Sequence, residues 1–370
     1  MTGESVYIIL PSTAIGGVEK RLAGLFLHLA EHDHDVRLVA ANELVGLLRS
    51  SKEYVAIGRH EGRIDAFEGG HDAFAGLRRH LRHIFASAPR GVFHYGLASP
   101  LRLHAASSRR TLYTIPNASL AQYNARGLIE VYGGILRATR VDVLDPSVFA
   151  QLTSRFPWRR GSFSLTPGSY VDLELFRPAP AVEKKDLIVF CGLFSDEKQA
   201  PRLVGCIPTL LARLDAAGFS GAEILMLGRD PEGGTVTRRV AELGNPRVRA
   251  IFDPDPRPHL ARAKIFLSLQ RSTNHPSKAL LEAMASGCTP IVTDTRDSRR
   301  SAPDNLARYV PRDFTADDLA DACITLLRTP LDRLDAHADA MRTFLGEHFS
   351  LRAMAAYYRT LYHQLRALPP

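Results

Sequence analysis

Residues Asn274–Gly287 read NHPSKALLEAMASG, and this stretch decides the fold of the chain. The apolar run Ile265–Leu269 precedes it, and a second short run, Thr289–Thr293, follows it. Short continuous runs of this kind are typical of buried strands in a parallel sheet. Between the two runs, apolar residues recur at helical spacing, and Gly287 suits a helix end. The sequence therefore predicts a strand, a short loop, a helix and a second strand.

The start of this helix has the features of an anion-binding site. Pro276 suits the first helical position, and Asn274 or His275 can cap the helix. The first turn leaves backbone N–H groups at the positive end of the helix dipole, where a phosphate or a sugar hydroxyl can dock. Glu282 follows two turns later, with acceptor oxygens for a vicinal diol such as a ribose. The alternative is an ordinary strand–helix–strand unit in which Glu282 is solvated.

This stretch resembles the donor-site signature of the retaining GT-B glycosyltransferases, in particular their family 4. That signature is a Glu, seven residues, and a second Glu at the start of a helix of the type L-E-A-M-A-x-G. Residues 280–287, LLEAMASG, match the helix, and Asn274 replaces the first Glu. The resemblance implies that Glu282 holds the nucleotide ribose and that Asn274 contacts the donor sugar without a charge. It also implies backbone contacts to sugar and phosphate at Ser277, Lys278 and Ala279.

Length and composition bound the class of protein. A chain of 370 residues predicts two domains, and 45% hydrophobic residues is ordinary for a globular protein. The four cysteines are scattered in apolar stretches without metal-site spacing, so we expect reduced core thiols. No apolar run approaches the roughly 18 residues of a membrane span, and no signal peptide precedes Val6. We therefore expect a cytoplasmic protein.

The net charge of +8 indicates an anionic partner. Basic clusters lie in the first half, and the absence of a nucleic-acid motif argues against nucleic acid. An anionic membrane surface or a phosphate-bearing acceptor fits better, and the protein would then be peripheral on the inner membrane face. The stripe from Phe74 to Phe85 predicts either a solvated helix packed on the sheet or a membrane-surface helix. The clusters are Arg78, Arg79 and Arg82, and Arg109 with Arg110.

The chain opens with another strand–helix–strand pattern. The strand Val6–Leu10 leads to Gly16 and Gly17, and Val36–Ala40 is the next strand. The sequence GGVEK is similar to the glycine loop that faces the cleft in family 4, so both glycines are expected to line the donor site. A nicotinamide-binding loop would need GxGxxG, which this loop lacks.

The boundary between the two domains is predicted at Pro167–Pro178, PGSYVDLELFRP. This segment resembles the interdomain link of the family, P-N-G-V-D-x-x-x-F-x-P. The resemblance implies an α/β GT-B fold, with two Rossmann-like domains whose parallel sheets face a central cleft. We expect an N-terminal domain at residues 1–170, a nucleotide-sugar-binding domain at 171–348, and a helix at 349–370 that crosses back to the first domain.

A cation near the start of the second domain is expected to neutralise the leaving diphosphate. The family pattern G-R-x-x-x-x-K appears here as Gly192 to Lys198, with Leu193 at the arginine position. Lys198 is therefore a catalytic candidate, although an isolated lysine is more often a surface residue. Lys278 or Arg271 could supply the missing cation. Because cations and helix ends do this work in GT-B enzymes, we expect no metal and no cofactor.

Five further residues are candidates for contacts with the donor or with a metal. Gly228 ends a strand where the family's nucleotide-flanking loop lies, and it is expected to allow close approach to the nucleotide. His94 and Asn117 are candidates for contacting the donor sugar, although an isolated histidine is more often structural. Asp253 and Asp255 resemble a metal-binding pair of GT-A enzymes, a weaker interpretation because the chain alternates strands and helices in both halves.

The function implied is transfer of a sugar from a nucleotide-diphosphate sugar to a glycan or lipid-linked acceptor. By resemblance, the anomeric configuration is retained and the pathway is surface polysaccharide synthesis. Besides a nucleic-acid binder, which only the charge favours, two alternatives stay open at this point. One is a sugar-nucleotide epimerase of the same fold, and the other is a non-catalytic protein that binds a nucleotide sugar or a glycan.

Overall fold

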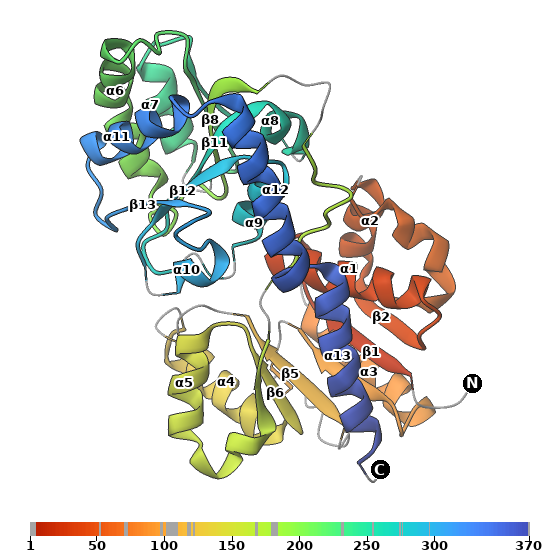
Figure 1. Cartoon of the computed structure of the whole chain (residues 1–370). Coiled ribbons are helices and arrows are strands. Elements are labelled where there is room, and N and C mark those ends of the chain that lie inside the picture. The colour runs from red at the N-terminus through yellow and green to blue at the C-terminus, as the bar shows by residue number, and fades with distance from the viewer. Residues whose placement is uncertain are drawn as a thin grey trace. The chain divides into compact units, whose positions relative to one another are not determined.

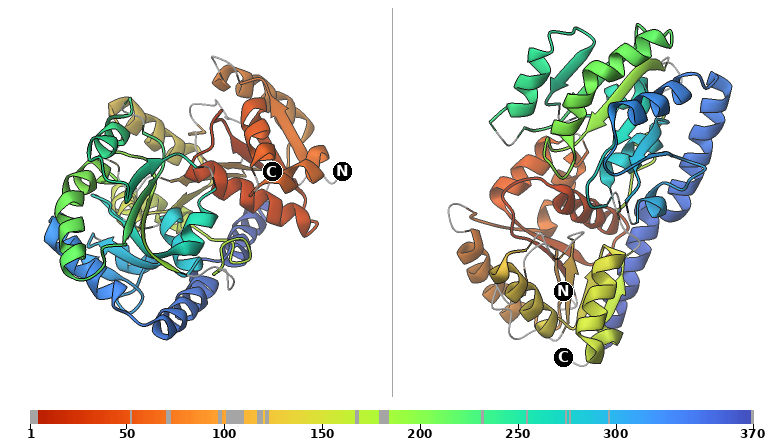
Figure 2. Two further views of the ribbon diagram at one scale, coloured as in Figure 1. Left: turned by 90° about the horizontal axis from the view of Figure 1, so that it is seen from above. Right: turned by 90° about the vertical axis from the view of Figure 1, so that its left-hand side faces the viewer.

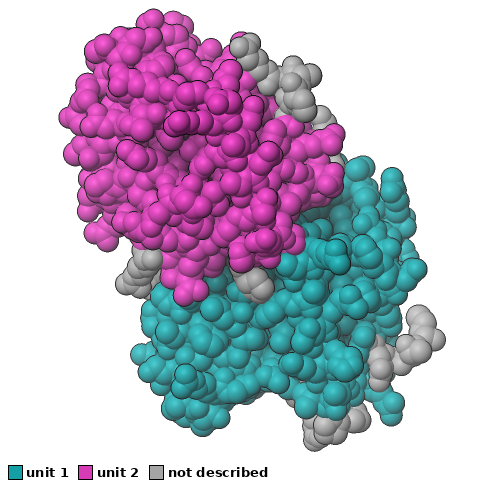
Figure 3. All heavy atoms as spheres, viewed as in Figure 1, with its two compact units in different colours: residues 1–170, 351–370 teal, residues 171–350 magenta. Residues whose placement is uncertain are grey.

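The computed structural model describes residues 5–368 except 52, 70–72, 97–98, 101–109, 117–119, 121–122, 167–168, 179–183, 231–232, 254, 274, 276 and 296. The chain divides into two compact units (Figure 3). Unit 1 comprises residues 1–170 and 351–370, and unit 2 comprises residues 171–350.

Unit 1 is built on a parallel sheet of seven strands in the order β3-β2-β1-β4-β5-β6-β7. The central strand β1 is buried along its whole length, as its unbroken apolar sequence VYIIL predicts. The chain moves from β1 to β3 in one direction and then returns to β4 on the other side of β1. The strands are β1 (Val6–Leu10), β2 (Val36–Ala41), β3 (Ile64–Phe67), β4 (Val92–Tyr95), β5 (Thr111–Ile115), β6 (Arg140–Val143) and β7 (Phe163–Leu165).

Helices cover both faces of this sheet (Figures 1 and 2). The C-terminal helix α13 belongs to unit 1, where it packs against α1 and β4, as the sequence predicts. The elements are α1 (Gly17–Glu31), α2 (Asn42–Ser50), η1 (Val55–Arg63), α3 (Ala73–Ser87), α4 (Ala125–Arg137), α5 (Pro146–Arg155), η4 (Pro157–Ser162) and α13 (Leu351–Arg366).

Helix α3 turns its apolar stripe inward. Leu77, Leu81 and Ile84 are buried in the core of unit 1, whereas Arg79 and Arg82 are exposed. This is the arrangement of a solvated helix packed on a sheet. The predicted membrane-surface role of α3 would therefore rest on its charge alone, because its large apolar side chains already lie against the domain.

A buried polar network attaches α13 to the sheet of unit 1. The guanidinium of Arg21 donates to the hydroxyl of Tyr358 at 2.7 Å, and that hydroxyl donates to Asp142 at 2.7 Å. Tyr357 donates to the other oxygen of Asp142 at 2.5 Å. Burial raises the pKa of Asp142, and the nearby guanidinium opposes that rise. The network thus joins α1, β6 and α13 through charges that have no access to water.

Unit 2 contains a parallel sheet of six strands in the order β10-β9-β8-β11-β12-β13. The strands are β8 (Lys185–Cys191), β9 (Glu223–Leu227), β10 (Val248–Ile251), β11 (Ala263–Ser268), β12 (Thr289–Thr293) and β13 (Arg308–Val310). The helices are α6 (Ala200–Ala216), α7 (Thr235–Glu242), α8 (Arg257–Arg262), α9 (Lys278–Ala285), α10 (Ser298–Ser301), α11 (Ala316–Leu327) and α12 (Leu331–His348).

The stretch that opens the sequence analysis forms β11, α9 and β12, so the predicted strand–helix–strand unit is confirmed. The helix begins later than predicted, because Ser277 is its N-cap residue and Lys278 its first helical residue. None of the four cysteines forms a disulfide, and three of them are buried. Among the described residues, no helix is long and apolar enough to cross a membrane.

Removing the carboxylate of the buried network should destabilise unit 1 strongly. We expect Asp142→Leu to lower the free energy of unfolding by about 3–5 kcal/mol, because it leaves the charge of Arg21 buried without a counter-charge. Urea denaturation followed by circular dichroism measures this change. The control Tyr357→Phe removes one hydrogen bond and should cost about 1 kcal/mol. A loss for Asp142→Leu no larger than that of the control would contradict the network.

Candidate active site

The candidate site lies at the carboxyl ends of the strands of unit 2. The chain runs from β8 through β9 to β10 in one direction, and then crosses to β11 on the other side of β8. In open parallel sheets, ligands bind outside the carboxyl ends of the strands where the strand order reverses in this way. The loops that follow β8 and β11 are therefore the first place to look for a ligand.

Glu197 joins these two loops. Its backbone carbonyl accepts from the N–H of Arg271 at 2.9 Å. Its carboxylate accepts from the N–H and the hydroxyl of Ser272, each at 3.0 Å. Hydrogen bonds to an ionised acceptor are stronger than neutral ones, so Glu197 fixes the loop after β8 on the loop that leads to α9. The sequence offered no sign of this role beyond the position of Glu197 next to Lys198.

The loop after β8 is also hydrogen-bonded to the end of β9 and the loop that follows it. The N–H of Gly192 donates to the carbonyl of Leu227 at 2.9 Å, and that of Phe194 donates to Arg229 at 2.8 Å. Gly228 lies at this contact, and a Cβ there would come within 1.7 Å of the carbonyl oxygen of Gly192. Gly228 therefore admits the neighbouring loop, and its expected contact with a nucleotide stays a prediction.

Lys198 follows Glu197 directly and is held in this fixed loop. Burial lowers the pKa of its ammonium to about 8, and the charges of Glu197 and Cys191 oppose that fall. Lys198 is half-buried, so below pH 8 its side chain carries a positive charge that is only partly hydrated. Such a charge interacts strongly with an anion that replaces the missing water.

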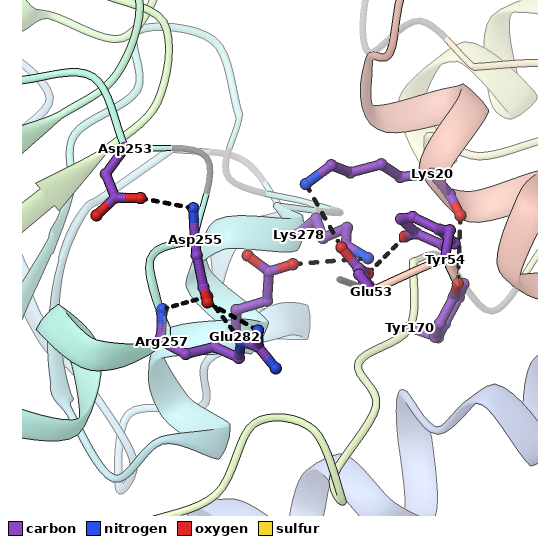
Figure 4. Close-up of polar contacts among 9 residues, drawn as sticks. All are labelled: Lys20, Glu53, Tyr54, Tyr170, Asp253, Asp255, Arg257, Lys278 and Glu282. Atoms are coloured by element: carbon purple, nitrogen blue, oxygen red, sulfur yellow. Dashed lines mark hydrogen bonds and ion pairs between the residues drawn. The ribbon is translucent and has the colours of Figure 1, made fainter. Parts of the chain in front are cut away.

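Glu282 is buried near the first turn of α9. Its residue is 6% exposed, so the alternative of a solvated glutamate is wrong. The ammonium of Lys278 lies 3.5 Å from its carboxylate, and both side chains come from the same face of the helix (Figure 4). Lys278 therefore compensates Glu282, which makes it a weaker candidate for the missing diphosphate cation. Arg271 is exposed in the loop that Glu197 fixes, and it stays a candidate.

The residues at the start of α9 are those that the sequence predicts to contact the sugar and the phosphate. Ser277 has an extended backbone and its side chain makes no capping hydrogen bond, and Ala279 is half-buried in the first turn. His275, one of the two predicted caps, is instead buried, with its Nδ1 atom 2.8 Å from the hydroxyl of Ser301. Asn274 and Pro276 lie outside the described residues.

Two cations hold the far end of α9. The ammonium of Lys184 donates to the carbonyls of Ser286 at 2.9 Å and Ala263 at 2.8 Å. The guanidinium of Arg342 donates to the carbonyl of Ala285 at 3.0 Å. Positive charges at a helix C-terminus are favourable, so this end of α9 is held in place.

The two aspartates of the weaker metal interpretation bind neighbouring side chains. Asp253 accepts from the N–H of Asp255 at 2.9 Å and lies 2.9 Å from the ring of His259. The guanidinium of Arg257 donates one hydrogen bond to each carboxylate oxygen of Asp255, both at 2.7 Å (Figure 4). Among the described residues, no group of three or more metal-ligating side chains comes together.

In unit 1, Gly16 and Gly17 are exposed where β1 leads into α1. The N–H of Gly16 donates to the carboxylate of Glu19 at 2.9 Å, and a Cβ on Gly16 would lie 2.8 Å from that carboxylate. Around Gly17, a Cβ would meet no atom within 4 Å. The helix start is thus accessible at Gly17, with an acidic side chain beside it.

His94 is buried in the core of unit 1. Its Nδ1 atom lies 2.7 Å from the hydroxyl of Tyr362, and its Nε2 atom lies 2.8 Å from the hydroxyl of Thr114. Burial lowers its pKa to about 3, and the charge of Arg21 acts in the same direction. This geometry supports the structural alternative for His94 and leaves no ring nitrogen for a sugar. Asn117, the other candidate, lies outside the described residues.

The loops of this site fall within a stretch that matches a known family. Residues 185–329 match the family described as glycosyl transferases group 1. The match runs from β8 into the loop after α11, so it includes the loops that Glu197 joins and the whole of α9. No curated protein sequence matches the chain.

Solved structures of similar fold cover almost the whole chain. The chain is similar to HepE from Anabaena in complex with UDP and glucose, at 11% identity and a TM-score of 0.75, over 98% of this chain and 100% of that one. It is similar to sucrose-phosphate synthase from Thermosynechococcus elongatus, at 18% identity and a TM-score of 0.73, over 98% and 99%. It is similar to the pneumococcal O-GlcNAc transferase GtfA in complex with UDP and GlcNAc, at 9% identity and a TM-score of 0.76, over 100% of each chain.

The titration of Lys198 tests the electrostatics of the site without a ligand. In protein labelled with ¹³C at lysine Cε, we expect one lysine signal with a midpoint near pH 8, and we expect Lys198→Met to remove it. Because the charge of Glu197 raises this pKa, Glu197→Gln should move the midpoint lower. A Lys198 signal that titrates near pH 10.4, the value of an unperturbed lysine, would show that the side chain is solvated.

The fold predicted from the sequence is confirmed: the chain has the GT-B fold, and its second unit carries the sequence pattern of the glycosyl transferases group 1 over residues 185–329.

Proposed function

We propose that this chain is a retaining glycosyltransferase that moves a sugar from a nucleotide-diphosphate sugar to a glycan or lipid-linked acceptor. One observation carries the proposal: the contacts of Glu197 join the loop of Lys198 to the loop before α9, within the stretch that matches the family. A cation and a helix start thereby belong to loops that are hydrogen-bonded to each other, at the switch point of a parallel sheet. These are the groups that a leaving diphosphate requires.

In the proposed reaction the chain binds the donor and neutralises its leaving group. The bond from the anomeric carbon to the phosphate oxygen breaks while the bond to the acceptor oxygen forms on the same face of the sugar. The acceptor proton passes to the departing phosphate, so no side chain needs to act as the base. Lys198 and the N–H groups at Ser277, Lys278 and Ala279 stabilise the charge that develops on the diphosphate.

Glu282 is proposed to bind the ribose of the nucleotide. Its buried carboxylate forms an ion pair with Lys278, which balances its charge. The ribose hydroxyls would donate hydrogen bonds to this same carboxylate. A buried acceptor discriminates strongly between a ligand that donates hydrogen bonds and one that does not. UDP is the first nucleotide to test, because the structures of HepE and GtfA hold UDP with a sugar.

A specific observation favours a second candidate, a non-catalytic protein that binds a nucleotide sugar. Leu193 is 47% exposed at the position where the family pattern has an arginine. An apolar side chain there cannot stabilise the departing diphosphate. Binding without turnover, measured with UDP-glucose and UDP-GlcNAc, would support this candidate over the transferase.

The ribose role predicts a loss of nucleotide affinity. We expect Glu282→Ala to weaken the binding of UDP by about 1–3 kcal/mol, because the ribose hydroxyls lose their acceptor. Isothermal titration calorimetry gives the two dissociation constants. Glu242→Ala, which removes an exposed carboxylate from α7 of the same unit, is the matched control and should bind UDP as the wild type does. Equal affinity in Glu282→Ala and the control would remove the ribose role.

The charge-neutralisation proposal also predicts the effect of metal removal. If Lys198 and the helix start meet the charge of the diphosphate, sugar transfer or donor hydrolysis should continue in EDTA at close to its untreated rate. Added Mg²⁺ or Mn²⁺ should change the rate little. Turnover that stops in EDTA and returns with either metal would instead assign a role to Asp253 and Asp255.

A further inference from the structure

The outward face of α4 in unit 1 carries two large apolar side chains. Val131 and Ile135 of this helix are buried against the sheet, as in any helix that covers a domain. Ile129 and Leu136 lie on the opposite side, where they are 66% and 55% exposed. A helix on the surface of a soluble domain usually presents polar residues in this direction. The side chains of Ile129 and Leu136 therefore do not contribute to the core of unit 1.

The only tryptophan of the chain extends this apolar face. Trp158 in η4 is 72% exposed. Its ring packs edge-on against Phe156 at a centroid distance of 5.7 Å, and Phe156 packs against Tyr132 of α4 at 5.5 Å. Tyr132 lies on the same side of α4 as Ile129 and Leu136, by helical spacing. Trp158 thus packs onto α4 through Phe156 and Tyr132, and we call the outward side chains of α4 together with Trp158 the α4–η4 surface.

The segment that carries the α4–η4 surface is rich in arginine. Residues 123–163 contain six arginines and no lysine, and their acidic residues are Glu130, Asp142 and Asp145. Asp142 and Asp145 are buried, and Glu130 pairs with Arg126 at 3.6 Å. The outward charge of this part of unit 1 is therefore almost wholly positive. The exposed arginines are Arg126, Arg137, Arg155 and Arg160.

We propose that the α4–η4 surface docks on an anionic lipid bilayer. Tryptophan prefers the membrane interface, because its ring is apolar and its N–H is polar. Isolated apolar side chains on a helix face can enter the headgroup region, and the arginines of the same segment meet the lipid phosphates. The basic helix α3 offers only charge for this purpose, since its apolar side chains are buried in the domain.

The proposal does not depend on glycosyl transfer. The α4–η4 surface belongs to unit 1, whereas Lys198 and Glu282 belong to unit 2. In Figure 1, α4 lies beside α5, whose C-terminal end leads into η4. If the acceptor is lipid-linked, docking of this surface would keep the protein at the membrane that contains the acceptor.

The single tryptophan allows a direct test in the unmodified protein. We expect the emission of Trp158 to shift to shorter wavelength when vesicles of phosphatidylglycerol and phosphatidylcholine are added at low salt. The shift should be small with pure phosphatidylcholine and should weaken at high salt. Brominated lipid should quench the emission of the bound protein. An emission spectrum that no vesicle changes would overturn the proposal.

Matched variants separate insertion of this surface from general attraction between charges. Ile129→Ser/Leu136→Ser keeps the tryptophan and should weaken vesicle binding about tenfold or more. The variant in which Arg126, Arg137 and Arg160 become Ser should lose affinity on the order of 100-fold, about fivefold for each arginine. The control in which Arg78, Arg79 and Arg82 of α3 become Ser removes the same charge and should lose far less.

Three outcomes would overturn the assignment. Equal losses in the two triple-arginine variants would mean that total charge, not this surface, attracts the protein. Unchanged binding of Ile129→Ser/Leu136→Ser would mean that its apolar side chains do not enter the bilayer. A tryptophan shift that follows protein concentration without vesicles would mean that a second copy of the chain covers the surface. Each variant is first shown by circular dichroism to be folded.

Discussion

The candidate site depends on one carboxylate that accepts hydrogen bonds from a distant loop. Glu197 binds the N–H and the hydroxyl of Ser272, although 75 residues separate them in the sequence. Together with the hydrogen bond from the N–H of Arg271 to the carbonyl of Glu197, this contact ties the loops after β8 and β11 to each other. Loops fixed at a switch point can hold charged groups in place before a ligand arrives, which lowers the cost of binding. Lys198 benefits directly, because its position and its lowered pKa both follow from burial in this loop.

In unit 1, hydrogen bonds to buried charged groups also join segments that are far apart in the sequence, and here they stabilise the fold. Arg21, Asp142 and the tyrosines of α13 are buried together, and each charged group has hydrogen-bond partners. A buried polar network of this kind adds little net stability compared with apolar packing, but it strongly disfavours arrangements that leave a charge unpaired. It therefore specifies where the C-terminal helix lies on the sheet. His94 is part of the same region, which explains why a histidine at a strand end can be structural.

The sequence predicted local features well and distant contacts poorly. The strands around α9 and the position of Glu282 follow from apolar runs, helical spacing and a glycine stop, all within about 30 residues. The role of His94 could not be read in this way, because its partner Tyr362 is 268 residues away. The need for a glycine at position 228 was hidden in the same way, because the carbonyl that lies against it belongs to Gly192 of another loop. The exposure of Ile129 and Leu136 could not be predicted either. Apolar residues lie on two sides of this helix, and their spacing does not show which side packs against the sheet.

A structure determined with bound UDP tests the central claim most directly. The account predicts that the diphosphate lies between Lys198 and the N–H groups at Ser277, Lys278 and Ala279, with the ribose hydroxyls on the carboxylate of Glu282. It also predicts that the contacts between Glu197 and Ser272 persist in the complex. UDP bound away from the carboxyl ends of β8 and β11, or in that place without contact to Lys198 and Glu282, would contradict the account.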